Sequence, residues 1–483
     1  METVLQESKP AFLYERIVAD IATRIDAGSL RPGDRLPSVR SFSQKHGVSI
    51  STVMQAYRSL EDRLLIEARP QSGFYVRLKI SERPGEPEIS SPPVSANEVS
   101  VSRLIMDVCA SVLDPDIVPL GGAIPSPELL PTQQLNRMLA TVARKQGPRS
   151  TQYLVPLGDL ELRQEIARRS LDWGFNISSE DVIITCGCME ALALSLRAVA
   201  REGDTIAVES PTYFGVLQLI ESLRMKTLEI PTHPRHGISL EALEQAFKTR
   251  RVSAGLFMTN FHNPLGCVMS DDKKRELARL AATYQIPVIE DDLYGDIYHE
   301  PPRPKALKAF DEHGYVLYCS SFSKTLAPGF RVGWAVPGRH MPTVIQAKMA
   351  STIATAAPLQ MAISEFLKKG GYDHHLRRLR RSYAYNLARM SEAIATYFPE
   401  GTKATRPKGG FVIWVELPES VDALQLYHQV LARKIGIAPG PIFSATKTYA
   451  NFIRLNGGYP WSERIEEALK VIGRMAEKMA RQR

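Results

Sequence analysis

The chain of 483 residues has little cysteine, and its five Cys form no C-x-x-C pair. An odd count without paired spacing argues against a secreted disulfide framework and against a zinc ribbon, and it fits a reducing cytoplasm. Cys186 and Cys188 stand one residue apart, but a lone C-x-C pair lacks the further ligands of a metal or redox centre. We therefore predict no metal site.

Long apolar runs are also missing. Residues 1–10 hold no apolar segment of the signal-peptide kind, and no stretch of about 20 residues is free of charge. The most apolar stretch, 182–200, carries Glu190 at its middle, and we interpret it as strand, turn and helix. These absences predict a protein with no membrane partner.

Charge is unevenly placed along the chain. The net charge is +8, and residues 35–79 hold eight Lys and Arg against three Asp and Glu. Such a local basic excess is typical of a module that binds phosphates, as in nucleic acid.

A Pro- and Ser-rich segment, 81–102, separates two different patterns. Its apolar residues show no period, and the adjacent Pro92 and Pro93 favour an extended chain. We expect a linker here, between a first domain at 1–80 and a second at 103–483.

The first domain has the pattern of three helices and a hairpin. Helices are predicted near 14–25, at Ser38–His46 and at Ser49–Asp62, followed by strands at Leu64–Ala68 and Phe74–Leu78. Two helices joined by a short turn, the second with a polar face, form a helix-turn-helix candidate with the hairpin as its wing. A bundle used only for packing or dimerisation is the alternative.

In the DNA-binding interpretation, two sets of side chains divide the contacts. Short polar residues at the start of the third helix approach base edges, and arginines hold phosphates. The first set is Ser49, Ser51, Thr52 and Gln55, and the second is Arg35, Arg40, Arg58 and Arg69.

The run from Pro32 to Val76 resembles the winged helix-turn-helix of GntR-type bacterial regulators. The matching pieces are L-P-S-x-R at Leu36–Arg40, G-V-S-x-x-T-V at Gly47–Val53 and G-F-Y-V at Gly73–Val76. The resemblance covers nearly the whole first domain and implies that it binds DNA.

The second domain alternates short apolar runs with helical stretches, which favours a mostly parallel α/β sheet. We expect a large lobe at about 150–340 and a smaller α+β lobe at about 341–483. The predicted strands are 182–185, 206–208, 256–258, 288–289 and 316–319.

Residues with a shared chemistry follow several of these strands, where α/β sheets place ligands. The run Ser320–Thr325 sets Lys324 among small hydroxyl residues, which suits a lysine that forms a Schiff base beside a bound phosphate. Alone, this lysine would more simply be a surface loop residue. Four other segments add further groups. A carboxylate comes from Glu290–Tyr294, and a helix start that begins with Gly comes from Thr185–Glu190. An aromatic face comes from Pro211–Gly215, and an amide comes from Asn260–Gly266.

Together these pieces resemble the fold-type I aminotransferases, from about residue 105 to 483. The resemblance implies a pyridoxal 5′-phosphate cofactor, with Lys324 as its catalytic Schiff-base lysine and Asp291 on the pyridine nitrogen. It implies that Tyr213 stacks on the ring, that Asn263 and Tyr294 hold the phenolate, and that Arg454 takes a substrate or effector carboxylate. The implied phosphate cup comprises Ser321, Ser323, Arg331 and the backbone of Gly187, Cys188 and Met189, with Tyr153 reaching the neighbouring subunit's phosphate. Cys188 departs from the family, which usually has a small or polar residue there.

A basic cluster, His374–Arg381, lies on a predicted helix of the second domain. A solvated or subunit-facing helix is the simplest interpretation, and a second DNA contact is the alternative. His374 and His375 diverge too far on a helix to share a metal.

The complete order of parts resembles the MocR subgroup of GntR-type regulators. It implies a homodimer in the bacterial cytoplasm, associated with the nucleoid when bound to a double-stranded operator. The aminotransferase-like domain would bind pyridoxal 5′-phosphate and sense either the cofactor or a small amino compound. The alternative is a working aminotransferase with an appended regulatory domain, since Lys324, Asp291 and Arg454 are all present.

Overall fold

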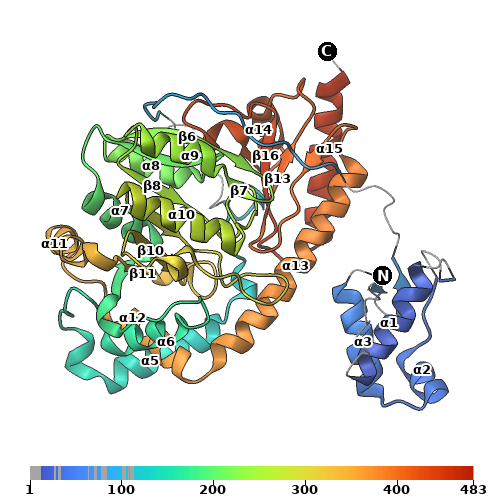
Figure 1. Ribbon diagram of the computed structural model, residues 1–483. Helices are drawn as coiled ribbons and strands as arrows, with labels where there is room; N and C mark the ends of the chain where they lie inside the picture. The colour runs from blue at the N-terminus through green and yellow to red at the C-terminus, as the bar shows by residue number, and fades with distance from the viewer. Residues whose placement is uncertain are drawn as a thin grey trace, which may run out of the picture. The chain divides into compact units, whose positions relative to one another are not determined.

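The computed structural model describes residues 12–26, 29–30, 34–63, 65–69, 73–77, 84–100, 105–106, 108 and 114–481. The chain forms two compact units, Met1–Arg83 and Pro84–Arg483 (Figure 1).

The first unit packs three helices against a small hairpin. The helices are α1 (Leu13–Asp26), α2 (Val39–His46) and α3 (Ile50–Asp62). The hairpin pairs β1 (Ile66–Arg69) with β2 (Gly73–Val76) in antiparallel register. The predicted winged helix-turn-helix is therefore confirmed.

Local chemistry sets the ends of these helices. The Ser38 hydroxyl accepts from the Ser41 amide at the start of α2, and Gly47 ends α2 with φ +65°. The Tyr57 hydroxyl donates to the Pro37 carbonyl over 2.9 Å and so fixes α3 against the start of α2. The apolar faces predicted from the sequence meet in one core, which includes Ile17, Val18, Ile21, Phe42, Val53, Ala56, Tyr57 and Leu60.

An eight-stranded sheet organises the second unit. Its five central strands, from β10 to β6, run parallel, whereas β11 is antiparallel to both of its neighbours and β7 is antiparallel to β6. The strand order is β4 (Ile183–Cys186), β11 (Val332–Val336), β10 (Val316–Ser321), β9 (Val288–Asp291), β8 (Ala254–Phe257), β5 (Thr205–Ser210), β6 (Lys226–His233) and β7 (Gly237–Ile238).

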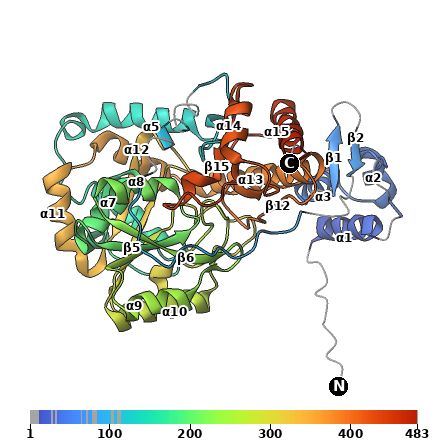
Figure 2. The same ribbon diagram turned by 90° about the horizontal axis from the view of Figure 1, so that it is seen from above.

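Helices lie on both faces of this sheet. In Figure 2, α9 and α10 lie on one side of β5 and β6, and α8 lies on the other. The helices around the sheet are α5 (Thr132–Lys145), α6 (Leu160–Arg169), α7 (Gly187–Val199), α8 (Phe214–Ser222), α9 (Leu240–Lys248), α10 (Asp271–Tyr284), α11 (Met341–Ser351) and α12 (Ala357–Lys368). The last two pack on α7, α5 and α6, although the sequence places them in the small lobe.

The small lobe is a second, four-stranded sheet with three helices. Its strand order is β12 (Lys403–Ala404), β13 (Val412–Glu416), β16 (Phe452–Asn456) and β15 (Ala438–Pro439). Its helices are α13 (Gly371–Tyr397), α14 (Ala423–Leu431) and α15 (Glu463–Arg481). The short β14 (Ile435–Gly436) pairs in parallel with β3 (Val118–Pro119), so a segment ahead of the large lobe joins the small one.

All five predicted strands of the large sheet are present, and 182–200 forms strand, turn and helix as expected. The sequence analysis did not predict β6, β7 and β11. The apolar pattern of Lys226–His233 is broken by Lys226, Glu229 and Pro231, so the sequence shows no apolar run there. Glu229 can be buried in this strand because it has polar partners that only the tertiary structure supplies. Val332–Val336 directly follows the loop with Lys324, and for this reason the sequence analysis did not separate it from that loop as a strand.

The segment predicted as a linker differs from that expectation. Its described part, 84–100, lies along the second unit and bonds to it at several points. Asn97 and Thr227 exchange backbone hydrogen bonds of 2.8 and 2.9 Å, and the Ala404 amide donates to the Gly85 carbonyl over 2.8 Å. Low apolar content did not leave this stretch free, because exposed strand edges offered it backbone partners.

Within the described ranges, no helix is long and apolar enough to cross a membrane. The same ranges hold no cluster of three or more His, Cys, Asp or Glu side chains placed to hold a metal ion.

Candidate functional site

A cavity of about 320 Å³ opens at the carboxyl ends of β5, β9 and β10. Ten of the residues predicted from sequence line it, although they come from widely separated loops. They are Cys188, Met189, Tyr213, Asn263, Asp291, Tyr294, Ser321, Ser323, Lys324 and Arg331.

Lys324 follows β10 and reaches into this cavity. Its Nζ donates to the Ala123 carbonyl over 2.7 Å. Desolvation, together with the positive charges of Arg454 and Arg331, lowers the pKa of this lysine to about 8. A substantial fraction of the amine is therefore uncharged near neutral to mildly basic pH, as a nucleophile must be.

Asp291 is the last residue of β9 and is buried. Its Oδ1 accepts from the Leu293 amide over 3.2 Å and from the Cys188 thiol over 3.3 Å. Burial raises the pKa of Asp291 to about 7. A cationic ring nitrogen brought against this carboxylate would stabilise its charged form.

Cys188, the departure from the family, thus has a defined contact. Burial and the neighbouring carboxylate of Asp291 raise the pKa of its thiol well above the usual value. The thiol therefore stays protonated and serves as a hydrogen-bond donor to Asp291.

The start of α7 and Arg331 form a concave, positively charged corner. Gly187 has φ +73°, and a Cβ there would stand 2.3 Å from Nη2 of Arg331. Nη1 of Arg331 donates to the Ser323 hydroxyl over 3.2 Å, and Nη2 donates to the Cys186 carbonyl over 3.3 Å. A helix start, a guanidinium and small hydroxyls are the donor set that a phosphate group requires.

Two tyrosines and an asparagine define the space for a ring. Tyr213 immediately precedes α8, and its ring lies close over Gly215, where a Cβ would be 2.5 Å from it. Burial raises the pKa of Tyr294, and the Asn263 side chain is one of its hydrogen-bond partners. Asn263 also accepts from Nη1 of Arg454 over 3.1 Å.

Arg454 is fully buried on β16 of the small lobe. Its guanidinium bonds to the carbonyl of Gly121 as well as to Asn263, and it lies 5.0 Å from the centre of the Phe443 ring. Arg454 is not among the residues that line the cavity, but it bonds to two that do, Gly121 and Asn263, so the small lobe supports the cavity wall from behind.

The sequence analysis did not predict one wall of this cavity, Gly121–Ile124. Gly121 allows a close approach, since a Cβ there would stand 2.9 Å from the Ile437 carbonyl oxygen. The Gly-Gly pair followed shortly by Ile-Pro was the available signal, but its position far ahead of the large lobe gave no reason to place it at the site.

Tyr153 does not lie at the cavity of its own chain. Its side chain is 86% exposed, which is unusual for a large aromatic residue. Its predicted contact with a neighbouring subunit's phosphate remains a prediction.

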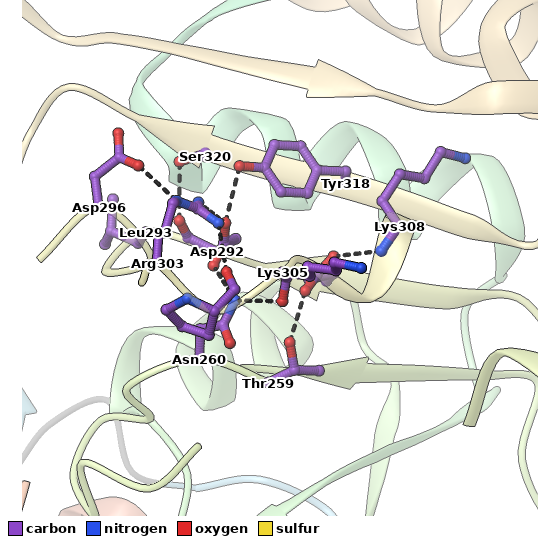
Figure 3. Close-up of polar contacts among 12 residues, drawn as sticks. Thr259, Asn260, Asp292, Leu293, Asp296, Arg303, Lys305, Lys308, Tyr318 and Ser320 are labelled. Atoms are coloured by element: carbon purple, nitrogen blue, oxygen red, sulfur yellow. Dashed lines mark hydrogen bonds and ion pairs between the residues drawn. The ribbon is translucent and has the colours of Figure 1, made fainter. Parts of the chain in front are cut away.

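A buried polar network surrounds Asp292, the residue that follows Asp291 at the end of β9 (Figure 3). Asp292 accepts from Nη2 of Arg303 over 2.5 Å and from the Tyr318 hydroxyl and the Asn260 amide over 3.0 Å each. Arg303 also binds Asp296 over 2.7 Å. Because neighbouring residues of a strand face opposite ways, this network anchors the strand end that presents Asp291 to the cavity.

In the first unit, Ser49 has a structural contact that the sequence analysis did not assign. It caps α3, since its hydroxyl accepts from the Thr52 amide over 3.1 Å. The hydroxyls of Ser51 and Thr52 lie 2.8 and 2.7 Å from the same oxygen.

The other predicted DNA contacts divide in a simple way. Gln55 and Arg58 are exposed on α3, and Arg40 is exposed on α2. Arg35 lies beside the wing, where its backbone forms an isolated antiparallel β-bridge with Tyr75. The side chain of Arg69 lies outside the described part of the structure.

The basic cluster on α13 is partly structural. His375 is buried and its Nε2 lies 2.7 Å from the Thr325 carbonyl oxygen. Arg380 donates to the Asp296 carbonyl over 2.7 Å and covers the Tyr298 ring. His374, Arg377, Arg378 and Arg381 are exposed.

Comparisons with known proteins assign the two units of the chain to two different families. Residues 127–472 match the aminotransferase class I and II family, and residues 13–76 match the gntR family of bacterial regulatory proteins. An uncharacterized HTH-type transcriptional regulator of Escherichia coli (strain K12), YdcR, is 41% identical over 96% of this chain and 99% of its own length.

Solved structures resemble the second unit. The multiple substrate aminotransferase of Thermococcus profundus is 28% identical, with a TM-score of 0.73 over 78% of this chain and 96% of its own. The α-aminoadipate aminotransferase LysN of Thermus thermophilus, complexed with N-(5′-phosphopyridoxyl)-L-leucine, is 28% identical with a TM-score of 0.72. That match covers 80% of this chain and all of LysN.

Proposed function

Since the chain belongs to the aminotransferase class I and II family and carries a gntR-family DNA-binding domain ahead of it, we propose that it is a transcriptional regulator. This order of domains is the MocR-like arrangement. In the proposal, pyridoxal 5′-phosphate and an amino compound control the regulator. The first unit binds a double-stranded operator, and the second holds the cofactor. The proposal places the protein in the bacterial cytoplasm, at the nucleoid when it is bound to DNA.

One observation carries this proposal: a single chain joins an exposed, polar recognition helix to a cavity equipped for the cofactor. Arg40, Gln55 and Arg58 are exposed on the helix-turn-helix, where they can meet phosphates and base edges. The cavity holds Lys324 and Asp291 with perturbed pKa values, as functional sites do.

The residues present fit pyridoxal 5′-phosphate. Gly187 leaves room that any side chain would fill, and Arg331 closes the phosphate corner beside it. When bound, the cofactor supplies an aldehyde that combines reversibly with amines. Lys324 would offer the amine, Asp291 would pair with the ring nitrogen, Tyr213 would stack on the ring, and Asn263 with Tyr294 would hold the phenolate oxygen.

In this proposal Arg454 selects, among amino compounds, those that carry a carboxylate. A carboxylate on such a compound would take the guanidinium in a bidentate pair, in competition with Asn263 and the Gly121 carbonyl. Because Arg454 is on the small lobe and Lys324 is on the large one, a ligand bound to both makes contacts that depend on the lobe arrangement. Differential contacts of this kind are what a ligand needs to shift a conformational equilibrium.

The assembly in this proposal is a homodimer. The solved relatives are aminotransferases, and the 86% exposure of Tyr153 suits a residue that completes the partner's site. A dimer also presents two DNA-binding domains to a two-part operator.

A working aminotransferase is the second candidate. Lys324, Asp291 and Arg454 are all in place for it, and nothing that transamination needs from these three is missing. The two candidates differ in whether the amine alters DNA affinity or is consumed with a keto acid.

The deciding experiment titrates operator affinity against a panel of amino compounds. Operator fragments are first selected from genomic DNA with the full chain loaded with pyridoxal 5′-phosphate. We expect at least one carboxylated amine to change the operator affinity of the native protein by about fivefold or more. The operator affinity of Lys324→Ala should not change with any amine. Unchanged affinity with every amine, together with sustained turnover of a keto acid, would establish the aminotransferase instead.

A further inference from the structure

Residues 84–100, here called the strap, are held by both lobes of the second unit. On the small lobe, the Ala404 amide donates to the Gly85 carbonyl over 2.8 Å, and Arg406 donates to the Pro84 carbonyl over 3.1 Å. Figure 2 shows the blue trace of this segment running past β12 and on to β6. The strap therefore crosses between the lobes that carry Lys324 and Arg454.

On the large lobe, the strap follows the edge of β6. Ser90 bonds to Thr232 in both directions, since its hydroxyl accepts from the Thr232 amide over 2.8 Å and its amide donates to the Thr232 carbonyl over 3.3 Å. Asn97 pairs with Thr227 further along, and Arg251 donates to the Val94 carbonyl over 2.5 Å.

Docking of the strap limits how far the DNA-binding unit can stand from the cofactor unit. While the strap is docked, only residues 78–83 separate it from the first unit, and six residues span at most about 20 Å. If the strap were released, residues 78–100 could span about 80 Å. The docked state thus sets the reach of each DNA-binding unit.

A buried carboxyl group, Glu229 of β6, joins the strap's docking edge to the cavity. It is 3% exposed, and its hydrogen-bond donors include the Ser210 hydroxyl over 2.5 Å, the Ser444 hydroxyl over 2.8 Å and the Ala445 amide over 2.7 Å. Glu229 therefore holds the end of β5 and the loop before β16 in one arrangement.

Both of these segments lead into the proposed cofactor site. Ser210 is three residues ahead of Tyr213, and the Thr212 amide donates to the Phe443 carbonyl over 2.9 Å. The loop with Ser444 runs on into β16, which carries Arg454. A ligand that fixes the Tyr213 ring and the Arg454 guanidinium fixes the two segments that Glu229 joins.

The same junction contacts the strap. The Ser210 amide donates to the Thr232 hydroxyl over 3.1 Å, and Thr232 is the residue that pairs with Ser90. The Tyr449 hydroxyl lies 2.8 Å from the Ser210 hydroxyl and also has Ser90 as a side-chain partner. A continuous set of hydrogen bonds therefore runs from the cavity loops to the strap.

We propose that Glu229 is a positioning residue that couples occupancy of the cavity to docking of the strap, and so sets the length of chain that tethers the DNA-binding unit. This inference rests on the proposed function and supplies its regulation. Ligand in the cavity orders the Ser210 and Ser444 segments, which tightens the strap on β6. An unliganded cavity lets the strap loosen on β6, and the tether lengthens once the contacts of Pro84 and Gly85 with the small lobe are released as well.

The test is hydrogen–deuterium exchange of the peptides covering 84–100 in the full chain, with and without pyridoxal 5′-phosphate. We expect the cofactor to slow exchange of the strap by about fivefold or more in the native protein. In Glu229→Gln and in Ser90→Ala, the cofactor should still bind, as its absorbance shows, but this slowing should be largely lost.

Ser91→Ala is the matched control, because Ser91 is the exposed neighbour of Ser90. It should keep the native response. Linkage adds a second readout: if cofactor binding tightens the strap, loosening the strap in Ser90→Ala must weaken cofactor affinity by the same factor.

Two results would overturn the coupling. One is strap exchange that is equal with and without bound cofactor in the native protein, and the other is a full response in Glu229→Gln. Failure of the proposed function is separable from these, because it shows as operator affinity that ignores every ligand while strap exchange still responds.

Discussion

The amine of Lys324 illustrates how much the cavity alters a single residue. Its ordinary pKa of 10.5 falls to about 8, with desolvation as the largest cause and Arg454 as the next. The two residues are predicted to bind different parts of a ligand, yet each affects the other through charge. Reactivity and carboxylate recognition are therefore linked before any ligand arrives.

The first prediction concerns the pH dependence of cofactor attachment. Only the uncharged amine attacks an aldehyde, so the attachment rate should rise with pH up to about 8 and then level off. Stopped-flow absorbance from about pH 6 to about pH 10 measures this, and borohydride reduction with peptide mapping locates the label on Lys324.

Arg454→Met provides the comparison. Removing a nearby positive charge favours the protonated amine, so the midpoint should move to higher pH. A native profile that keeps rising to about pH 10.5, like that of a free lysine, would contradict the interpretation.

At the scale of elements, the end of β9 shows how a strand serves two faces. Glu290 and Asp292 point away from the cavity into polar networks, and Asp291 points into it. Arg303 lies between Asp292 and Asp296, and its side chain is only 7% exposed. The three consecutive acids are tolerated because each has its own set of donors.

The second prediction tests that anchor. Arg303→Met leaves two carboxylates without their cation, which should lower the free energy of unfolding by about 3 kcal/mol. All four Trp residues are in the second unit, so urea unfolding followed by tryptophan fluorescence reports on it alone. Arg279→Met is the control: its pair with Glu276 is exposed, and its loss should cost less than about 1 kcal/mol. Equal effects of the two substitutions would rule out the anchoring contribution.

The third prediction belongs to α2 and α3. Arg40→Ala should weaken binding to all DNA sequences and reduce the salt slope by about one, as the loss of a phosphate contact does. Gln55→Ala should instead relax preference at one base position, by about 1–3 kcal/mol. Fluorescence anisotropy at several salt concentrations, with operator variants, separates the two effects.

Arg24→Ala serves as the control for charge, because Arg24 is an exposed cation on α1 that pairs with Asp20. It should leave both affinity and slope nearly unchanged. If it weakened binding as much as Arg40→Ala, the phosphate contact would lose its assignment to α2.

At the scale of the whole molecule, the site depends on distant parts of the chain meeting. Gly121–Ile124 and the large-lobe loops line the cavity, Arg454 bonds to two of the lining residues, and Tyr153 is left exposed to solvent. In the proposed homodimer this tyrosine reaches the phosphate site of the neighbouring subunit, so each site depends on two chains.

The fourth prediction uses that dependence. Lys324→Ala and Tyr153→Ala should each weaken cofactor binding in homodimers, the second by about tenfold for one lost hydrogen bond to a charged group. Mixing the two variants should restore one native site per heterodimer, with Lys324 from one chain and Tyr153 from the other. Equilibrium dialysis of cofactor against co-expressed heterodimers measures it, and absence of restored sites would show that Tyr153 acts within its own chain or not at all.

Local sequence by itself determined many of the elements of this protein and the chemical types in its site. Apolar spacing fixed α1 and α3, Ser38, Ser49 and Gly47 fixed the helix ends, and short apolar runs fixed five strands. Residues that follow strands in a parallel sheet meet at one edge, which is why ten of the predicted residues line one cavity. A regular backbone repeats its geometry, so these outcomes need only neighbours in sequence.

The tertiary structure alone decided the contacts that join distant segments. Nothing near Cys188 in sequence shows that its thiol donates to Asp291, and nothing near Ser90 shows that it pairs with Thr232. The strap looked free because its composition is polar, yet edge strands satisfy its backbone. Burial of Glu229 likewise depends on donors more than 200 residues away in the loop before β16, and pairings across such separations are set by the packing of the whole unit.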